Sequence, residues 1–336
     1  MKKIILISLI FIVGCKESHQ KQKSSEQSRF SVEILEEEAL QFLSPTSKIE
    51  EIGKGYAWTE GPLWIDDGNY LLFSDIPNNK VFKINDKGDA SVYLDSSGYT
   101  KGMQRGGELG SNGLLLNPKG ELVLLQHGDR RIAKMEAPLN DPRSIYSTII
   151  GDFEGKRFNS PNDATYDEKG NLFFTDPPYG LSDGMKDTAK ELGFQGVYCL
   201  KTTGELMLLD TLTRPNGIAI SHDGSKIYVA VSDPKQAVWY EYDLASDGQL
   251  ANKRVFYDAT DLVGKEGQQG LPDGMKMHTK GYLFATGPGG LWIFNKKGKA
   301  IARIFTGEAT SNCAFGPNQN VLYITADDYL MRATFK

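Results

Sequence analysis

Six polar side chains recur at the same place in six similar segments of the sequence. Each segment runs from a Gly- or Pro-flanked polar residue through an apolar stretch, a tight turn and a second apolar stretch. The polar residues are Glu60, Asn112, Asn162, Asn216, Asp273 and Asn312. Two carboxylates and four amides, brought together, form the oxygen-rich environment that Ca²⁺ prefers and that also suits Mg²⁺ or Mn²⁺. Zn²⁺ is the least favoured ion, because it normally takes His or Cys ligands.

The same residues also have a structural interpretation that needs no ligand. Asn-Gly, Asp-Gly and Glu-Gly are common turn dipeptides, and at any single position a turn is the better explanation. Six polar residues in phase, with acids at only two of the positions, favour a metal site. Within this set we expect Asn112 and Asn312 to support the site and not to bind the ion.

A second regularity indicates that the segments are repeats of one element. The residue eight positions after each leading polar residue is a glycine in five segments and an asparagine in the last. These residues are Gly68, Gly120, Gly170, Gly224, Gly281 and Asn320. Glycine and asparagine tolerate the positive φ of a hairpin turn. Each segment therefore predicts two antiparallel strands joined by a tight turn.

A further pair of strand-like runs follows most of these hairpins, as in residues 80–94 and 238–257. Four strands in about 50 residues is the size of a propeller blade. The absence of a long helical pattern between strands disfavours folds with crossover helices. We therefore expect an all-β, six-bladed β-propeller over residues 47–336. Residues 47–57 would supply the strand that the short last unit lacks.

Blade geometry predicts where the polar residues lie. The first strand of a blade is nearest the central channel, and eight residues of strand span about 25 Å. The leading polar residues should therefore form a ring at one mouth of the channel, with the turns at the other. The second strands return to the first mouth, and their ends are Asp75, His127, Asp176 with Tyr179, and Asp233.

The N-terminus has the pattern of an exported bacterial protein. A positive start is followed by an apolar run at 4–13, which is too short to span a bilayer. The run ends at Cys15 in a sequence similar to a lipobox, although an ordinary cleaved signal with a chance cysteine is the alternative. We expect residues 1–15 to be a signal peptide and lipidated Cys15 to attach the protein to the membrane without a spanning helix. Because Lys16 is not the Asp that often retains lipoproteins at the inner membrane, we expect the outer membrane, facing the periplasm or the surface.

Residues 16–46 are expected to link the lipid to the propeller. The stretch 16–30 is rich in Lys, Ser, Gln and Glu and cannot bury enough apolar surface to order itself, which favours a flexible tether. A short helix from Val32 to Leu43 is expected before the propeller begins.

Charge and cysteine content exclude some classes of partner. The net charge is −5 and no basic stripe is present, which argues against a nucleic-acid groove and leaves a neutral or polar small molecule. Beyond the signal, only Cys199 and Cys313 remain, in separate predicted strands, so two free buried thiols are expected in place of a disulfide. We expect a monomer.

Several long motifs in the right order resemble a known family. They are TEGPLW (59–64), LLQHGDRRIAKM (124–135), KRFNSPNDATYDEKGNLFFTDPPYGL (156–181), RPNGIAIS (214–221) and LPDGMKM (271–277). Over roughly residues 47–335 the chain resembles the senescence-marker-protein/gluconolactonase/luciferin-regenerating family, and it is most similar to the bacterial gluconolactonase-like branch. The resemblance implies a lactone hydrolase with one divalent cation in the channel mouth.

The resemblance also implies roles for particular residues. Glu60, Asn216 and Asp273 would be metal ligands, and Asn162 would be a fourth ligand or a substrate contact. Some members have an Arg two positions before that Asn, where this sequence has Ser160. Arg157 lies five positions before Asn162. The resemblance therefore implies Arg157 as a substrate contact, although its position departs from the family pattern.

Two further residues are candidates for substrate binding. His127 belongs to the HGDRR motif and is a general base, a substrate contact or a structural histidine, and the last two together are favoured over the first. Tyr179 lies at the base of residues 181–195, which interrupt the third blade and could form a partial lid. One or two helical turns are expected there from Met185 to Leu192. A surface loop without a role is the equal alternative.

The expected chemistry is hydrolysis by water. A cation would polarise the lactone carbonyl and stabilise the oxyanion, while Asp273 orients or deprotonates the attacking water. No Gly-x-Ser-x-Gly motif is present, so a side-chain nucleophile is not indicated. The alternatives are an aryl esterase or phosphotriesterase with the same cation, and a propeller that binds a sugar or a protein at the envelope without turnover.

Overall fold

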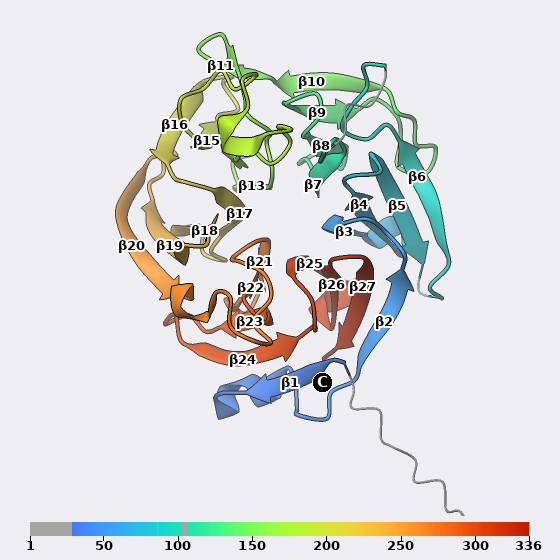
Figure 1. The fold of residues 1–336 in the computed structure, drawn as a ribbon, viewed down its shortest axis with the longest axis vertical. Helices are drawn as coiled ribbons and strands as arrows, with labels where there is room; N and C mark the ends of the chain where they lie inside the picture. The colour runs from blue at the N-terminus through green and yellow to red at the C-terminus, as the bar shows by residue number, and fades with distance from the viewer. Residues whose placement is uncertain (1–28, 86, 103–106, 336) are drawn as a thin grey trace, which may run out of the picture.

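Six antiparallel sheets surround a central axis in the computed structural model, which describes residues 29–85, 87–102 and 107–335 (Figure 1). The expected all-β, six-bladed β-propeller is confirmed. Each blade runs outward from an innermost strand that begins within two residues of one of the leading polar residues. Cys15 and the proposed signal peptide lie outside the described residues.

The blades follow one another in chain order. Blade 1 holds β3 (Thr59–Ile65), β4 (Tyr70–Asp75), β5 (Lys80–Asn85) and β6 (Ala90–Asp95). Blade 2 holds β7 (Ser111–Leu116), β8 (Leu122–Gln126), β9 (Arg131–Met135) and β10 (Tyr146–Ile150). Blade 3 holds β13 (Ala164–Tyr166), β14 (Leu172–Asp176), β15 (Gly196–Leu200) and β16 (Leu206–Thr211), and is preceded by the small hairpin of β11 (Asp152–Phe153) and β12 (Lys156–Arg157).

The second half of the ring repeats the pattern. Blade 4 holds β17 (Pro215–Ile220), β18 (Lys226–Asp233), β19 (Gln236–Leu244) and β20 (Leu250–Asp258). Blade 5 holds β21 (Met275–Met277), β22 (Leu283–Gly287), β23 (Gly290–Phe294) and β24 (Ala300–Phe305). Blade 6 holds β25 (Thr310–Phe315), β26 (Val321–Ala326) and β27 (Tyr329–Thr334). The 3₁₀ turns are η1 (Glu37–Gln41), η2 (Asp66–Gly68), η3 (Gly184–Lys186), η4 (Thr260–Leu262) and η5 (Pro317–Gln319).

The ring is closed by a strand from the beginning of the propeller. β2 (Ile49–Lys54) pairs antiparallel with β27 and places Ile49 opposite Ala333. The prediction that residues 47–57 complete the last blade is confirmed. Because the first and last parts of the chain share one sheet, the ring cannot open without breaking that ladder (Figure 1).

The turn residues follow the predicted pattern at four of the six positions. Gly120, Gly170, Gly224 and Gly281 all have positive φ. In blade 1 the left-handed residue is instead Asn69, one position after Gly68, because η2 forms the turn there. In blade 6 it is Asn318 and Gln319, while Asn320 has φ −90°. The prediction for Gly68 and Asn320 is therefore wrong in detail, because a 3₁₀ turn shifts the left-handed position.

The segment before the propeller is part of the fold. In place of the helix expected from Val32 to Leu43, the structure has β1 (Ser31–Ile34) and the short η1. β1 pairs with β24 and extends blade 5 to five strands. The free edge of β24 offers hydrogen bonds to a β-branched sequence, and this outweighs the local helical pattern. Phe42, just after η1, packs edge-on against Phe284 and Phe335.

The apolar core lies between neighbouring sheets and leaves the axis to polar groups. Between blades 6 and 1, for example, Trp64 stacks on Tyr323 with ring centroids 5.4 Å apart, and Leu71 and Leu330 are fully buried beside them. Cys199 and Cys313 are buried free thiols, as predicted. Among the described residues, no helix has the length and apolar character needed to cross a membrane.

Candidate active site

A cavity of about 260 Å³ opens at one mouth of the axis. Its wall includes five of the six leading polar residues together with Tyr179. These residues are Glu60, Asn112, Asn162, Asn216, Asp273 and Tyr179. Asn312 does not line this cavity, but lies behind Glu60 and donates from Nδ2 to Glu60 Oε2 at 3.0 Å. The structure thus brings together polar side chains from five successive blades.

Four oxygens in this wall are buried and have no hydrogen-bond partner in the described part of the chain. They are Oδ1 of Asn112, Asn162, Asn216 and Asp273. Leaving a buried acceptor unpaired costs about 1–3 kcal/mol, so four of them in one cavity indicate a missing partner that carries positive charge or donates hydrogen bonds. Asn112, which was expected only to support the site, is oriented like the others.

Hydrogen bonds within the wall fix the direction of the free oxygens. Asn216 Nδ2 donates to Ser232 Oγ at 2.9 Å, so the amide oxygen of Asn216 must point the other way. Ser232 Oγ in turn donates to the carbonyl of Pro272 in the next blade at 2.5 Å. The orientation of Asn216 is therefore set before any ligand arrives.

The glycine after a leading polar residue allows adjacent blades to meet at the axis. A Cβ on Gly217 would lie 2.2 Å from the carbonyl oxygen of Asp273. A Cβ on Gly274 would lie 2.0 Å from Cγ of Asn312. The Asn-Gly and Asp-Gly pairs lie at points of close approach inside or just before the inner strands, so the turn interpretation of these dipeptides is not supported.

Carboxylates at the ends of two second strands hold the chain that leads into the site. Asp75 accepts hydrogen bonds from the backbone N–H groups of Ala57 and Trp58, just before Glu60. Asp176 accepts them from Asn159 and Ser160, just before Asn162. Both acids were predicted to reach this mouth, and there they bind the backbone.

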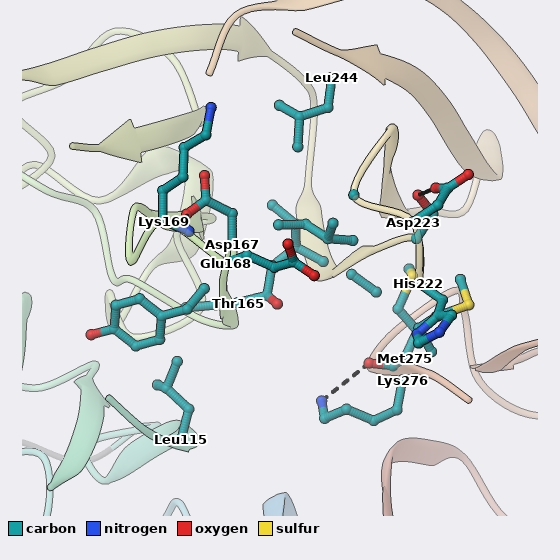
Figure 2. Close-up of a pocket in the computed structure, with 18 of the residues that line it drawn as sticks. Leu115, Thr165, Asp167, Glu168, Lys169, His222, Asp223, Leu244, Met275 and Lys276 are labelled. Atoms are coloured by element: carbon teal, nitrogen blue, oxygen red, sulfur yellow. Dashed lines mark hydrogen bonds between the residues drawn. The ribbon is translucent and has the colours of Figure 1, made fainter. Parts of the chain in front are cut away.

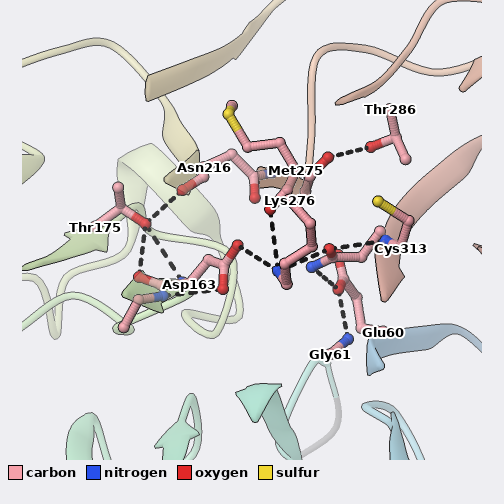
Figure 3. A network of polar contacts seen from close by, with 12 residues as sticks. Glu60, Gly61, Asp163, Thr175, Asn216, Met275, Lys276, Thr286 and Cys313 are labelled. Atoms are coloured by element: carbon pink, nitrogen blue, oxygen red, sulfur yellow. Dashed lines mark hydrogen bonds and ion pairs between the residues drawn. The ribbon is translucent and has the colours of Figure 1, made fainter. Parts of the chain in front are cut away.

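A lysine that does not itself line the cavity contacts residues behind its wall. Lys276 Nζ is 3.8 Å from Asp163 Oδ2 and donates to Asn312 Oδ1 at 3.4 Å. Through Asn312 the contacts continue to Glu60, and Figure 3 shows Lys276 between Asp163 and Glu60. Lys276 and the backbone N–H of Cys313, which donates to Asn312 Oδ1 at 2.9 Å, together orient the Asn312 amide so that its nitrogen faces the Glu60 carboxylate.

The two carboxylic acids of the site are buried close to each other. Burial raises the pKa of Glu60 to about 7. The hydrogen bonds that Glu60 accepts from Gly61 and Asn312 lower this pKa but do not outweigh the burial. Burial, and then the neighbouring Glu60, raise the pKa of Asp273 well above its ordinary value. Two acids in this position are difficult to ionise together unless a cation lies between them.

The remaining predicted substrate contacts do not line this cavity. Arg157 is exposed, and its guanidinium donates to the carbonyl of Asp129 at 3.0 Å. His127 is fully buried behind the wall. The wall also contains Trp58 and Glu108, which the sequence interpretation did not select. Trp58 directly precedes the TEGPLW motif, and Glu108 lies in a Gly-rich loop four residues before Asn112. Both residues are thus close in sequence to a leading polar residue, and this closeness is the signal that could have identified them.

The loop at 181–195 is tied to blade 2 and to the hairpin of β11 and β12, since Arg157 N–H donates to Glu191 Oε2 at 2.9 Å. It contains only the 3₁₀ turn η3 in place of the helical turns expected from Met185 to Leu192. Arg130 Nη1 donates to the carbonyl of Ala189 at 2.9 Å, and Leu192 is buried. No residue of 181–195 is among those that line the cavity.

A second, larger cavity of about 680 Å³ lies at the opposite mouth. Figure 2 shows its wall, with the turn residues Asp167 and Asp223 and the apolar Leu115 and Leu244. The two aspartates accept hydrogen bonds from residues of their own turns. Buried acceptors without partners are concentrated at the first cavity, which is therefore the candidate site.

The donor atoms of that cavity fit a hard divalent cation. In residues 29–85, 87–102 and 107–335, no cluster of three or more His, Cys, Asp or Glu side chains is arranged to hold a metal. The available donors are instead the carboxylates of Glu60, Glu108 and Asp273 and three amide oxygens, a set that suits Ca²⁺ better than Zn²⁺.

Fold and cavity define the class: a six-bladed β-propeller with an oxygen-lined pocket at one end of its axis. Residues 58–328 match the family described as the SMP-30/Gluconolactonase/LRE-like region. The chain belongs to this family, which confirms the resemblance of its motifs.

Individual relatives agree with this assignment. The chain is 37% identical to a gluconolactonase of Zymomonas mobilis over 299 residues, which is 88% of this chain and 83% of the relative. The solved structure of a gluconolactonase from Xanthomonas campestris superimposes with a TM-score of 0.76 at 27% identity, covering 91% of this chain and 95% of the other. A calcium-binding regucalcin from Agrobacterium tumefaciens shares the fold, with a TM-score of 0.66 at 16% identity over 86% of this chain and 94% of the other.

Proposed function

We propose that this protein is a lactonase that opens a sugar lactone of the gluconolactone type. The single observation that carries the proposal is the convergence of unpaired buried oxygens from Asn112, Asn162, Asn216 and Asp273 in one cavity. Membership of a gluconolactonase-like family supports the class of reaction. The cavity volume of about 260 Å³ is suited to one small ring.

Water is the proposed nucleophile. The aliphatic hydroxyl groups of the wall are already engaged, since Ser232 Oγ donates to Pro272 and Thr310 shares a hydrogen bond with Thr306. No histidine is among the lining residues to activate either hydroxyl. Asp273, buried with one free oxygen, is the group that would orient a water molecule and accept its proton.

A divalent cation, with Ca²⁺ favoured by the donors, is proposed to be held by Glu60, Asn162, Asn216 and Asp273. When bound, such a cation supplies a positive charge that polarises the substrate carbonyl. Asn112 would complete the set or contact substrate, because its free oxygen faces the same cavity. Ser232 and Asn312 orient Asn216 and Glu60 and so keep the donors in place.

The test is hydrolysis by protein stripped with EDTA and then given Ca²⁺, Mg²⁺, Mn²⁺ or Zn²⁺ singly. Activity should vanish on stripping and return best with Ca²⁺. Asp273→Ala should abolish turnover while the circular dichroism spectrum stays unchanged. Full activity in that variant, or after EDTA, would remove the proposed mechanism.

The substrate class needs its own test. A panel of sugar lactones, aryl esters and phosphotriesters should show the highest kcat/KM for a sugar lactone. A preference for aryl esters or phosphotriesters would instead favour a related hydrolase, and binding of a sugar without turnover of any substrate would favour a non-catalytic propeller.

We also propose that Cys15 is lipidated and anchors the protein in the cell envelope, at the outer membrane. The pattern of residues 1–16 supports this proposal. Cys15→Ser should move the protein from the membrane fraction to the soluble fraction and abolish incorporation of labelled palmitate. Unchanged fractionation would contradict it.

A further inference from the structure

A glutamate and a buried histidine meet at the edge of the candidate site. Glu108 precedes β7 by three residues and lines the cavity, and its side chain is 37% exposed. His127 directly follows β8 of the same blade and is fully buried. The two side chains approach to 3.5 Å between His127 Nδ1 and Glu108 Oε2.

The surroundings of His127 hold its ring in place. A Cβ on Gly180 would lie 2.7 Å from His127 Cβ, so the backbone of the segment after β14 packs directly on the histidine. The backbone N–H of His127 donates to the carbonyl of Gly110, two residues after Glu108. The histidine and the loop that carries Glu108 are therefore fastened together.

Neither ring nitrogen of His127 has a hydrogen-bond partner in the part of the chain that the structure describes. A buried imidazole without partners is costly, because both nitrogens lose the hydrogen bonds they make in water. Glu108 is the charged group placed to relieve this cost, after a small movement of its partly exposed side chain. His127 is thus held in place behind the wall, whereas the Glu108 side chain can move within the cavity.

Glu108 faces the proposed water-activating acid from the other side of the axis. Glu108 belongs to blade 2 and Asp273 to blade 5, which lie three places apart in a ring of six (Figure 1). A lactone bound in this cavity would therefore lie between the two acids. Opening the ring needs two proton transfers, one from the attacking water and one to the departing ring oxygen.

We propose that Glu108 is a second catalytic acid of the site, which protonates the ring oxygen of the lactone, and that His127 is its positioning residue. This inference rests on the proposed lactonase function. The water oxygen forms a bond to the carbonyl carbon and its proton passes to Asp273. The bond from that carbon to the ring oxygen breaks, and the ring oxygen takes the proton of the Glu108 carboxyl. The product is the open hydroxy acid, and exchange with solvent returns both carboxyl groups to their starting states.

His127 serves the step by sharing a proton with Glu108. A hydrogen bond between His127 Nδ1 and Glu108 Oε2, which lie 3.5 Å apart, keeps the carboxyl in one rotamer until substrate binds, and the shared proton then passes through Glu108 to the ring oxygen. The role accounts for an unusual combination, a fully buried histidine without partners beside an acid in the cavity wall.

The experiment compares two leaving groups in the cation-loaded full-length protein. An aliphatic sugar lactone releases an alkoxide, which needs the proton, whereas dihydrocoumarin, an aryl lactone, releases a phenolate, which does not. Glu108→Gln should lower kcat for the sugar lactone about 100- to 10,000-fold, the usual contribution of a general acid, and change kcat for dihydrocoumarin less than about threefold. His127→Gln should show the same selectivity with a smaller loss. If dihydrocoumarin is not turned over, a thiolactone, which releases a thiolate, takes its place.

A matched control is Glu191→Gln, which removes an exposed carboxylate 3.7 Å from Arg130 that does not line the cavity. It should leave both substrates unaffected. Equal losses on both substrates in Glu108→Gln, a rise in KM alone, or an unchanged kcat for the sugar lactone would each overturn the inference. Wild-type protein that opens no lactone would instead refute the proposed function, so the two failures are distinguishable.

Discussion

Unpaired oxygens of single side chains are the feature on which the site depends. Asn162, Asn216 and Asp273 each present a buried oxygen without a hydrogen-bond partner among the described residues. Their polar character is visible in the sequence, but the loss of solvent is not. Because these amide and acid oxygens are buried, leaving them without a partner costs free energy. Binding a cation would offset that cost.

Lys276→Met tests the contact chain beneath this cavity. The substitution leaves the Asp163 carboxylate without its cation and removes one of the two donors to Asn312 Oδ1, the other being the backbone N–H of Cys313, so the donor to Glu60 is held less firmly. We expect unfolding free energy to fall by roughly 2 kcal/mol, less than for a fully buried pair because Lys276 is partly exposed. Cation affinity, measured by calorimetry, should fall as well.

The double variant Lys276→Met/Asp163→Asn provides the control for that prediction. It should recover part of the lost stability, because the buried charge is removed together with its partner. Lys54→Met, at an exposed position of β2, should have no effect on either quantity. Additive losses in the double variant would contradict the proposed coupling.

The stability of the cation-free protein should depend on pH through Glu60. Its pKa is raised by burial from the ordinary 4.5 to about 7, so between these values the native state binds more protons than the unfolded chain. The contribution is therefore fully present below pH 4.5 and is lost as pH rises through about 7. Melting temperatures in EDTA should fall across this window, and saturating Ca²⁺ should reduce the fall, because it binds the ionised acids. Glu60→Gln should flatten the EDTA curve, and an unchanged slope in that variant would assign the effect to another group.

At the scale of elements, the inner strands set the positions of the ligands and the second strands secure them. Hydroxyl groups near the ends of second strands donate to backbone carbonyls of the next blade, as Thr175 does to Asn216 at 2.6 Å and Ser74 to Asn112 at 2.9 Å. Each inner strand is thereby fixed relative to its neighbour. The site is precise because this contact recurs between blades.

The segment before the propeller should contribute to stability. Phe42 is 2% exposed and packs against the aromatic rings of Phe284 and Phe335. Phe42→Ala should lower the unfolding free energy by about 3 kcal/mol, the usual cost of truncating a buried phenylalanine. Leu40→Ala, at a side chain that is 42% exposed, is the control and should cost much less. Equal effects in denaturant titrations would mean that this segment does not pack on the blades in solution.

For the whole molecule, the proposed cation links blades that are distant in the sequence. Its ligands would come from blades 1, 3, 4 and 5, so binding should stabilise the ring as a unit. With the cation at about 100 times its Kd, the native state should gain about 2.7 kcal/mol. Calorimetry should show one unfolding transition that shifts upward with cation concentration. A shift confined to one of several transitions would indicate a site within a single blade.

Much of the molecule could be predicted from the sequence because it repeats. The eight-residue offset from each leading polar residue to a turn residue predicted six hairpins, and the shortness of the last unit predicted the closing role of β2. The helix expected from Val32 to Leu43 was wrong, because pairing with the free edge of β24 decided that segment. The left-handed turn residue in blade 1 moved from Gly68 to Asn69, because local 3₁₀ geometry is not encoded in the spacing.

The sequence by itself determined the number of blades, the mouth at which the polar residues gather and the family. Period and residue type suffice for these properties, since every blade obeys the same strand geometry. Only the tertiary structure decided which polar groups remain unpaired. The Asn312 amide is hydrogen-bonded to Glu60 and Lys276, whereas Asn112 Oδ1 has no hydrogen-bond partner among the described residues. Glu108 and His127 come from different parts of blade 2 and approach to 3.5 Å. The reason is that hydrogen-bond partners and burial depend on side chains that adjoin only after the ring has closed.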